Sequence, residues 1–247
     1  MKLTYSLNIK IMYKKLLLIV VVFAFAKALS AQNTVVELFT SQGCSSCPPA
    51  DQLLADIQEK HGDDVITLSY HVDYWDYIGW KDPFATEDYT QKQYKYARAF
   101  SSRQVYTPQA IINGRSHFTG SDQQKMTKAL SAAKLADNKP SLKLNKVVKE
   151  AENVSVNYRL DAVTSSQTIT LALTIKKRVT SVKRGENRNR TLTNHNIVVD
   201  LTEVKAAGEG SVTLKIPHWV TDSDDLAVVS YVTEAGVGIV SALSSAI

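Results

Sequence analysis

Cysteine is nearly absent from this sequence: only Cys44 and Cys47, in the stretch "TSQGCSSCPPA", occur among 247 residues. Two cysteines cannot make a four-cysteine zinc site. A crosslink between them would close a very short loop and, in the chain-entropy model, stabilise the fold by only about 2 kcal/mol. A chain of this length can bury a sizeable core without crosslinks. We therefore expect the two cysteines to have a chemical role and not mainly to stabilise the fold.

Acidic residues are missing from residues 1–31, which contain five lysines. An apolar run from Leu16 to Ala26 follows two of these lysines and precedes a stretch of small residues. Its 11 residues are fewer than the roughly 20 that span a membrane. The pattern predicts a secretory signal peptide over residues 1–31, cleaved after Ser30 or Ala31, with an uncleaved anchor helix as the alternative. We therefore expect a periplasmic or secreted protein that is free of the membrane after cleavage.

The remaining chain has no excess charge of either sign. The five lysines of residues 1–31 account for the whole formal charge of +5, which leaves 24 basic and 24 acidic residues. The basic isoelectric point is therefore no argument for a nucleic-acid partner, and none is expected. Export also implies an oxidising compartment, in which disulfides persist.

A strand, a helix and a second strand are predicted around the two cysteines. Residues 33–40 are apolar and β-branched, as is typical of a buried strand. Residues 47–62 have two prolines directly after Cys47, carry one apolar face and end at Gly62, which predicts a helix. Residues 64–72 predict a strand that lies parallel to the first.

The rest of the chain divides near Lys139-Pro140. Before this point, the aromatic residues 71–84 precede a helix with Tyr89, Gln93 and Tyr96 on one face, where core packing is the favoured role. A strand, an Asn113-Gly114 hairpin turn and a last helix over 122–135 follow. After it come about seven short β segments, which predict a small all-β sandwich. No internal repeat or low-complexity segment interrupts the chain.

A Cys-x-x-Cys motif that opens a helix after a strand is typical of a thioredoxin-like redox site. Unpaired backbone N–H groups and the positive end of the helix dipole stabilise a thiolate there and lower its pKa. Cys44 lies outside the first turn, so we expect it to be exposed and to act as the nucleophile. Cys47 should be more buried and act as the resolving thiol that releases the mixed disulfide.

A proline provides a second redox signal. "VYTPQAIING" places Thr107-Pro108 before a strand and a hairpin, where thioredoxin-like folds carry a cis-proline opposite the redox pair. A cis bond at Pro108 would leave the backbone of Thr107 free to pair with an extended substrate peptide. An ordinary trans proline at the start of a strand is the alternative.

Two histidines and an aspartate extend the candidate site. His71 and Asp73 end the second parallel strand, at the edge of the sheet that should also hold Cys44. They are interpreted as a hydrogen-bonded loop pair or as groups that transfer protons to and from the thiols. A third interpretation is a metal site, in which Cys44, Cys47 and His71 would bind copper or zinc and His117 is another candidate ligand.

Glu37 is an acid within an apolar strand. An edge position or a salt bridge would explain it. The alternative is a buried carboxylate with a raised pKa that accepts the proton of Cys47.

Four motifs in order, "ELFTSQGCSSCPPAD", "HVDYWDYIGWKDPF", "VYTPQ" and "KRGENRNRTLTNHNIVV", resemble a bacterial family of exported thioredoxin-like proteins catalogued as domain of unknown function 1223 (DUF1223). The resemblance covers nearly all of the chain after the leader. It implies the fold class α/β: a thioredoxin-like domain with a helical insertion over residues 32–139, followed by a small all-β sandwich-like domain over residues 140–247.

The wider resemblance to thioredoxins matches Cys44 and Cys47 with the redox pair, Thr107 and Pro108 with the proline loop, and Glu37 with the buried acid. The resemblance implies no settled activity. The basic stretch from Lys176 to Arg190 is interpreted as a solvated loop or as a docking surface for a partner or for the first domain.

Three functions remain open on the sequence. The first is an exported thiol–disulfide oxidoreductase that acts on protein or small-molecule thiols with an unidentified redox partner. It would need no cofactor beyond a redox-active Cys44–Cys47 disulfide. The second is a copper or zinc carrier, and the third a redox-silent module that binds peptides in the proline groove. The direction of redox transfer cannot be predicted from these residues.

Overall fold

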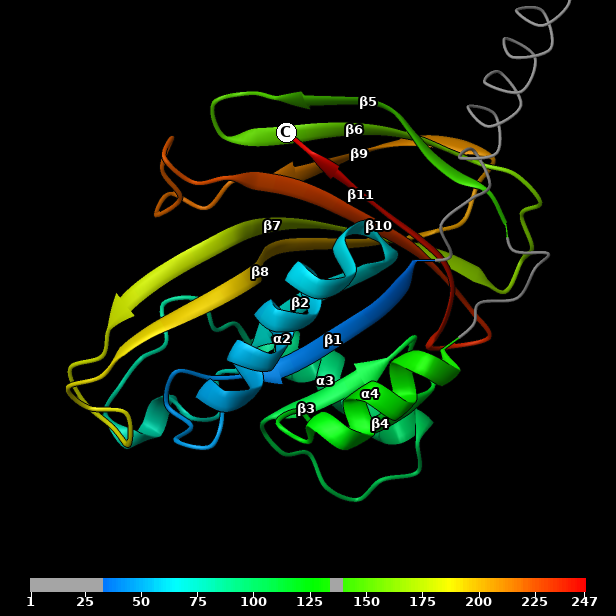
Figure 1. Cartoon of the computed structure of the whole chain (residues 1–247). Coiled ribbons are helices and arrows are strands. Elements are labelled where there is room, and N and C mark those ends of the chain that lie inside the picture. Colours follow the sequence, from blue (N-terminus) through cyan, green and yellow to red (C-terminus); the bar gives the residue numbers. More distant parts are fainter. Residues whose placement is uncertain (1–32, 134–139) are drawn as a thin grey trace, which may run out of the picture. The chain divides into compact units, whose positions relative to one another are not determined.

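The computed structural model describes residues 33–133 and 140–247, which contain an eight-stranded mixed sheet and a three-stranded sheet (Figure 1). The predicted signal peptide lies outside these residues, as does Lys139 at the predicted domain boundary. The elements in chain order are β1 (Thr34–Thr40), α2 (Pro48–His61), η1 (Gly62–Asp64), β2 (Val65–His71), η2 (Asp76–Ile78), α3 (Glu87–Ala99), β3 (Gln109–Ile112), β4 (Ser116–Thr119), α4 (Gln123–Ala132), β5 (Leu142–Lys149), β6 (Asn153–Leu160), β7 (Gln167–Ser181), β8 (Thr191–Lys205), β9 (Glu209–Lys215), β10 (Leu226–Glu234) and β11 (Gly238–Ala246).

The predicted strand–helix–strand unit is confirmed. All residues of β1 and β2 are buried, and the two strands pair in parallel from Thr34–Val65 to Thr40–His71. Pro48 and Pro49 occupy the first turn of α2, where a missing backbone N–H costs nothing. The Asn113-Gly114 turn, with positive φ at both residues, joins β3 to β4 as the sequence predicts.

The predicted fold class, α/β with a thioredoxin-like domain followed by a small β sandwich, is wrong: the described residues are mainly β, with three short helices on one large mixed sheet that both halves of the chain build. The long strand β8 lies parallel to β2, with Ser69 opposite Ile197, so that β7, β8, β10 and β11 extend the sheet of the first half in the order β11-β10-β7-β8-β2-β1-β3-β4. This pairing covers the edge of β2, whose backbone groups would otherwise need partners. The described residues form one compact unit with a mixed, mainly β architecture.

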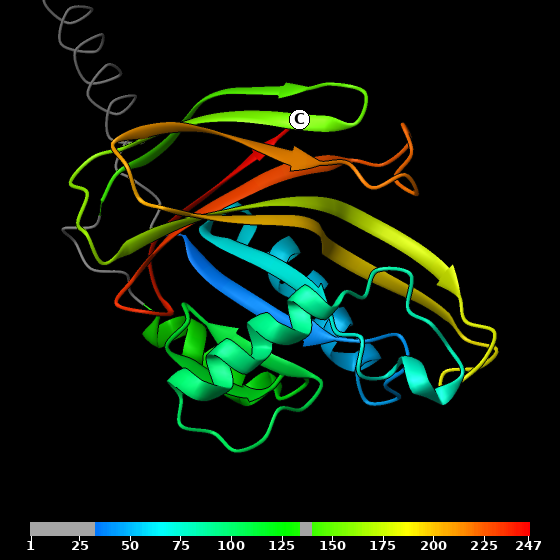
Figure 2. The ribbon, with the colours of Figure 1, turned by 180° about the vertical axis from the view of Figure 1, so that it is seen from behind.

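Both faces of the large sheet are covered. On one face, β1 and β3 pack against α2 and α4 through residues such as Leu38, Leu54 and Met126. On the opposite face, β1, β2 and β10 pack against α3 through Phe39, Tyr70 and Tyr96. The β5-β6-β9 sheet lies against β7, β8 and β10, where it buries a third apolar cluster (Figure 2). Tyr89, Gln93 and Tyr96 are buried along α3, as predicted.

None of the helices in the described ranges is both long enough and apolar enough to cross a membrane.

Candidate functional site

The two cysteines form a disulfide at the N-terminus of α2. Cys44 and Cys47 are joined across a Cα–Cα distance of 5.4 Å, and Cys47 is the N-cap residue with helical backbone angles. The turn is closed by backbone hydrogen bonds from Cys44 N to Ser41 O at 3.1 Å and from Cys47 N to Cys44 O at 3.2 Å. The sequence therefore places the pair at the start of the helix, as predicted.

The predicted exposure of Cys44 is wrong in this disulfide form. Both cysteines are 0% exposed, whereas Ser45 and Ser46 between them are exposed. The aromatic segment after β2 packs on the residue before Cys44: a Cβ atom added at Gly43 would lie 3.0 Å from Cβ of Trp75. Because both cysteines are buried, a reagent reaches either sulfur only after a local movement of the surrounding residues.

The helix N-terminus offers fewer donors to a thiolate than the sequence suggests. Pro48 and Pro49 have no N–H, and the N–H groups of Ala50 and Asp51 both donate to the carbonyl oxygen of Cys47. The positive end of the helix dipole remains. The polar group at the sulfur of Cys44 is the Ser46 hydroxyl, whose oxygen lies 3.3 Å from it.

The loop between β7 and β8, residues 182–190, holds the cysteine turn from the other half of the chain. Asn187 is fully buried, and its Nδ2 donates to the carbonyl oxygens of Gln42 and Cys44, both at 2.9 Å. Arg190 Nη1 donates to Oδ1 of Asn187 at 2.7 Å and so orients its amide. Glu186 Oε2 accepts from the N–H of Ser45 at 3.0 Å. The basic stretch thus docks on the first half, one of its predicted roles.

The bond between Thr107 and Pro108 is cis, as predicted. Pro108 is buried and Thr107 is half-buried. Trp75 Nε1 donates to Oγ1 of Thr107 at 2.7 Å. Because Trp75 also packs on Gly43, it connects the proline loop to the turn that precedes the disulfide.

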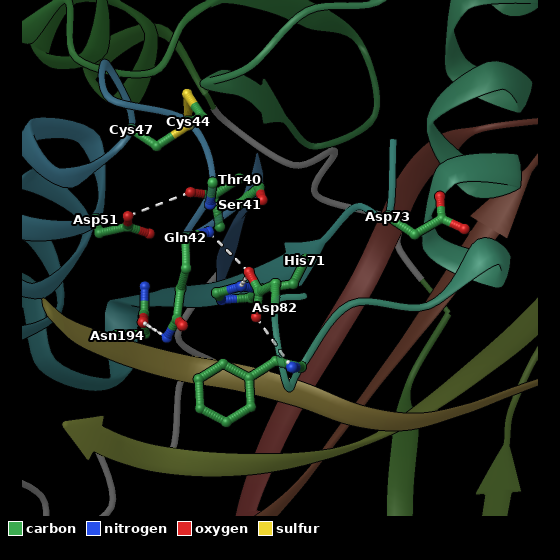
Figure 3. Close-up of polar contacts among 12 residues, drawn as sticks. Thr40, Ser41, Gln42, Cys44, Cys47, Asp51, His71, Asp73, Asp82 and Asn194 are labelled. Atoms are coloured by element: carbon green, nitrogen blue, oxygen red, sulfur yellow. Dashed lines mark hydrogen bonds and ion pairs between the residues drawn. A yellow bond between two sulfur atoms is a disulfide. The ribbon is translucent and has the colours of Figure 1, made fainter. Parts of the chain in front are cut away.

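A buried polar cluster lies beside the disulfide (Figure 3). Asp51 is four residues after Cys47, and this spacing places both side chains on one face of α2. Oδ2 of Asp51 accepts from the Thr40 hydroxyl at 3.2 Å. His71 Nδ1 lies 2.7 Å from Oδ2 of Asp82, and the same carboxylate oxygen accepts from the N–H of Gln42 at 2.7 Å.

Burial sets the protonation of this cluster. It raises the pKa of Asp51 to about 7, although the positive charge of His71 opposes the rise. Burial alone would lower the pKa of His71, but the carboxylates of Asp82 and Asp51 raise it above 6.5. Burial opposes ionisation of Asp82 as well, yet His71 and the N–H donors of Gln42 and Phe84 lower its pKa. The His71–Asp82 contact thus favours the charged form of both partners, and it lies near a carboxyl group whose pKa is about 7.

Two atoms of this cluster have no hydrogen-bond partner of good geometry among the described residues, Oδ1 of Asp51 and Nε2 of His71, although the amide of Asn194 lies close enough to the Asp51 carboxyl to lower its pKa slightly. Both side chains are almost completely buried. A buried polar atom without a partner costs roughly 1–3 kcal/mol, so its retention points to a role beyond packing.

Glu37 and Asp73 lie outside this cluster. Glu37 points to the α3 face of the sheet, where its carboxylate accepts from the hydroxyls of Tyr96 and Tyr231 and pairs with Lys92 Nζ at 3.4 Å. Asp73 accepts from the Thr90 hydroxyl of α3 at 2.6 Å. The partner of His71 is therefore Asp82 and not the predicted Asp73.

The comparisons with known proteins identify the family. The model of the family described as "Protein of unknown function (DUF1223)" matches residues 35–233. This chain belongs to the DUF1223 family. The predicted family membership is confirmed, and it brings no established activity.

A crystal structure of protein AGR_C_4864 from Agrobacterium tumefaciens is similar to this DUF1223 chain, with 32% sequence identity and a TM-score of 0.60 over 87% of this chain and 93% of that one. β-Glucosidase 3B from Thermotoga neapolitana, in complex with glycerol, aligns with 11% identity and a TM-score of 0.22 over 80% of this chain and 33% of that one, which is too low for an argument. No functionally curated protein matches the chain.

Sequence reasoning missed three residues of the site in this DUF1223 protein: Asp51, Asp82 and Asn187. The spacing of Asp51 from Cys47 by one helical turn was a usable signal. Asp82 and Asn187 stand within the motifs that resemble the family, but their positions gave no sign of a shared site.

The described ranges hold no group of three or more His, Cys, Asp or Glu side chains arranged to bind a metal ion. His117, the other candidate ligand, contacts Tyr106 and Phe100 instead. The geometry of the described residues therefore gives no support to the alternative in which Cys44, Cys47 and His71 bind copper or zinc.

Proposed function

We propose that this protein is an exported thiol–disulfide oxidoreductase that exchanges its Cys44–Cys47 disulfide with protein or small-molecule thiols. The observation that carries the proposal is Asp51, a buried carboxyl group with a pKa of about 7 and an unpartnered oxygen, one helical turn after Cys47. Groups with pKa values shifted towards neutrality concentrate at sites of proton transfer. The periplasm or the exterior of the cell would supply its thiol substrates and its redox partner.

The exchange needs one proton to move at Cys47. A substrate thiolate attacks the sulfur of Cys44, the Cys44–Cys47 bond breaks, and its electron pair passes to the sulfur of Cys47. Protonated Asp51 gives its proton to this thiolate, and a mixed disulfide remains at Cys44. A second substrate thiolate then releases Cys44 as a thiolate, so that the substrate leaves oxidised and the protein has gained two electrons. In the reverse direction, the Asp51 carboxylate accepts the proton of Cys47.

Full burial of both sulfurs favours a second candidate, the redox-silent peptide-binding module. In that case the disulfide would remain closed and the cis-proline loop at Thr107 would bind an extended segment. The two functions differ in whether the disulfide exchanges at all.

Equilibration with glutathione tests the proposal. We expect a reduction potential between about −120 and −270 mV, the range of known exchange catalysts. In a Cys47→Ala variant, Cys44 should accumulate mixed disulfides with an added cysteine peptide, because the resolving thiol is gone. The matched Cys44→Ala variant should accumulate far fewer. A disulfide with a potential below about −300 mV that traps no partner would support the silent module instead.

A further inference from the structure

The loop of residues 182–190 combines two properties that the proposed function does not use. Its inner side holds the cysteine turn through Asn187 and Glu186. Its outer side carries four exposed basic residues, Lys183, Arg184, Arg188 and Arg190. Figure 1 shows the loop at the end of the β7–β8 hairpin, next to the turn that precedes α2.

The positive charge of this loop is local. Glu186 is its only acidic residue, and its carboxylate is engaged by the N–H of Ser45. None of the four basic side chains takes part in an ion pair within the described residues. The chain from residue 32 onward is neutral, with 24 basic and 24 acidic residues, so this concentration of cations does not follow from composition.

Arg190 links the outer side to the inner one. Its guanidinium donates to the neutral amide oxygen of Asn187, and that amide in turn donates to the carbonyl oxygen of Cys44. A carboxylate is a stronger acceptor for a guanidinium than an amide oxygen is. An incoming carboxylate would therefore draw Arg190 away and weaken the hold of Asn187 on the cysteine turn.

We propose that the outer side of residues 182–190 docks an acidic segment of a protein partner, and that docking loosens the cover of the disulfide. The inference rests on the proposed function for its consequence, whereas the docking itself needs no redox chemistry. An acidic protein segment fits better than a nucleic acid or a lipid surface, because the loop lies directly on a cysteine turn whose exchange chemistry takes thiols. Electrostatic steering towards a cationic surface speeds encounter by tenfold or more and fades with salt.

Charge reversal at Arg184 and Arg188 tests the docking. Neither side chain makes one of the hydrogen bonds described above between the loop and the cysteine turn. The probes are two cysteine-containing peptides, one rich in Asp and Glu and one rich in Lys. We expect the acidic peptide to reduce the disulfide of the oxidised protein at least about tenfold faster than the basic one at low salt. The Arg184→Glu/Arg188→Glu variant should lose this advantage, whereas a Lys143→Glu/Lys146→Glu control on β5 should keep it. Reduction by a small neutral thiol should be unchanged in both variants.

Fluorescence anisotropy of a labelled acidic peptide without cysteine measures the docking alone. Binding to the oxidised protein should weaken at least about tenfold in Arg184→Glu/Arg188→Glu and in high salt, and stay unchanged in the β5 control. Equal binding of acidic and basic peptides would overturn the inference, as would binding to anionic lipid vesicles without binding to the acidic peptide. Neither result would touch the glutathione equilibrium that tests the proposed function.

Removal of the inner contacts tests the cover. Asn187→Ala deletes both hydrogen bonds from the Asn187 amide to the carbonyl oxygens of Gln42 and Cys44. Glu186→Ala, at an exposed position, deletes the hydrogen bond from the N–H of Ser45. We expect each variant to speed reduction by a small neutral thiol, by about tenfold for Asn187→Ala. Unchanged rates in a folded Glu186→Ala protein and a folded Asn187→Ala protein would overturn the covering role. A disulfide that reacts with no thiol in either variant would instead refute the proposed function. The anisotropy measurement would still decide whether the loop docks an acidic segment.

Discussion

Asp51→Asn should slow the release of a mixed disulfide by about 100-fold at pH 8, within the range that a general acid or base contributes. Cys47 must lose its proton to attack the Cys44 mixed disulfide, and the carboxyl group of Asp51, one helical turn away, is placed to take it. The carboxylate of Asp51 can do so once the pH exceeds its pKa of about 7. The wild-type rate should therefore rise through pH 7 and level off, whereas the variant should lack this step.

Stopped-flow absorbance measures this release directly, because a chromogenic aryl thiolate bound at Cys44 leaves when Cys47 attacks. Below about pH 6 the two proteins should converge, since Asp51 is then protonated in the wild type. Asp56→Asn, with the same change of charge on the exposed face of α2, is the matched control and should follow the wild type. A pH profile of Asp51→Asn identical to that of the wild type would remove Asp51 from the reaction.

The same shift predicts a stability change of known sign. Because the native pKa of Asp51 is raised from 3.8 to about 7, the native state holds a proton that the unfolded state loses between these values. Its contribution to the free energy of unfolding is therefore full below pH 4 and is lost as the pH rises to 7. Asp51→Asn should gain stability relative to the wild type over this interval, which denaturant unfolding at pH 5 and pH 8 would measure.

Lys92→Met should lower the free energy of unfolding by about 3–5 kcal/mol, because it leaves the Glu37 carboxylate buried without its cation. Glu37 is 0% and Lys92 is 8% exposed, and their charged groups lie 3.4 Å apart between α3 and β1. Burial opposes the positive charge of Lys92, yet Glu37 raises its pKa above the usual value. For a chain of this size the loss corresponds to a Tm lower by about 10 °C.

Two further variants show whether the loss of stability comes from the buried Glu37–Lys92 pair or from the removal of any lysine charge. Lys95→Met, which removes a half-exposed ion pair with Glu203, should cost about 1 kcal/mol or less. The double variant Glu37→Gln/Lys92→Met should recover most of the loss, because no buried charge is left unpaired. It should also keep the pH profile of disulfide exchange. A profile that loses its step near pH 7 in this variant would return Glu37 to its predicted role as proton acceptor of Cys47.

Local patterns explain which elements were predictable. The apolar run of β1, the two prolines that open α2 and the Asn113-Gly114 turn depend on neighbours in the sequence, and each has the predicted structure. Glu37 illustrates the limit of such patterns. Its place within an apolar strand left an edge position, a salt bridge or a buried carboxylate open, and only the alternation of side chains across the sheet decides that it faces α3, where it pairs with Lys92.

The sequence by itself determined the parallel β1–α2–β2 unit and the placement of Cys44 and Cys47 at the helix N-terminus, because spacing and turn chemistry act over a few residues. Only the tertiary structure decided that β8 pairs with β2, that Asp82 and not Asp73 partners His71, and that Asn187 donates to the carbonyl oxygen of Cys44. These contacts join segments up to 143 residues apart. Which strand edge meets which, and which loop then lies on the cysteines, depends on the packing of the whole chain.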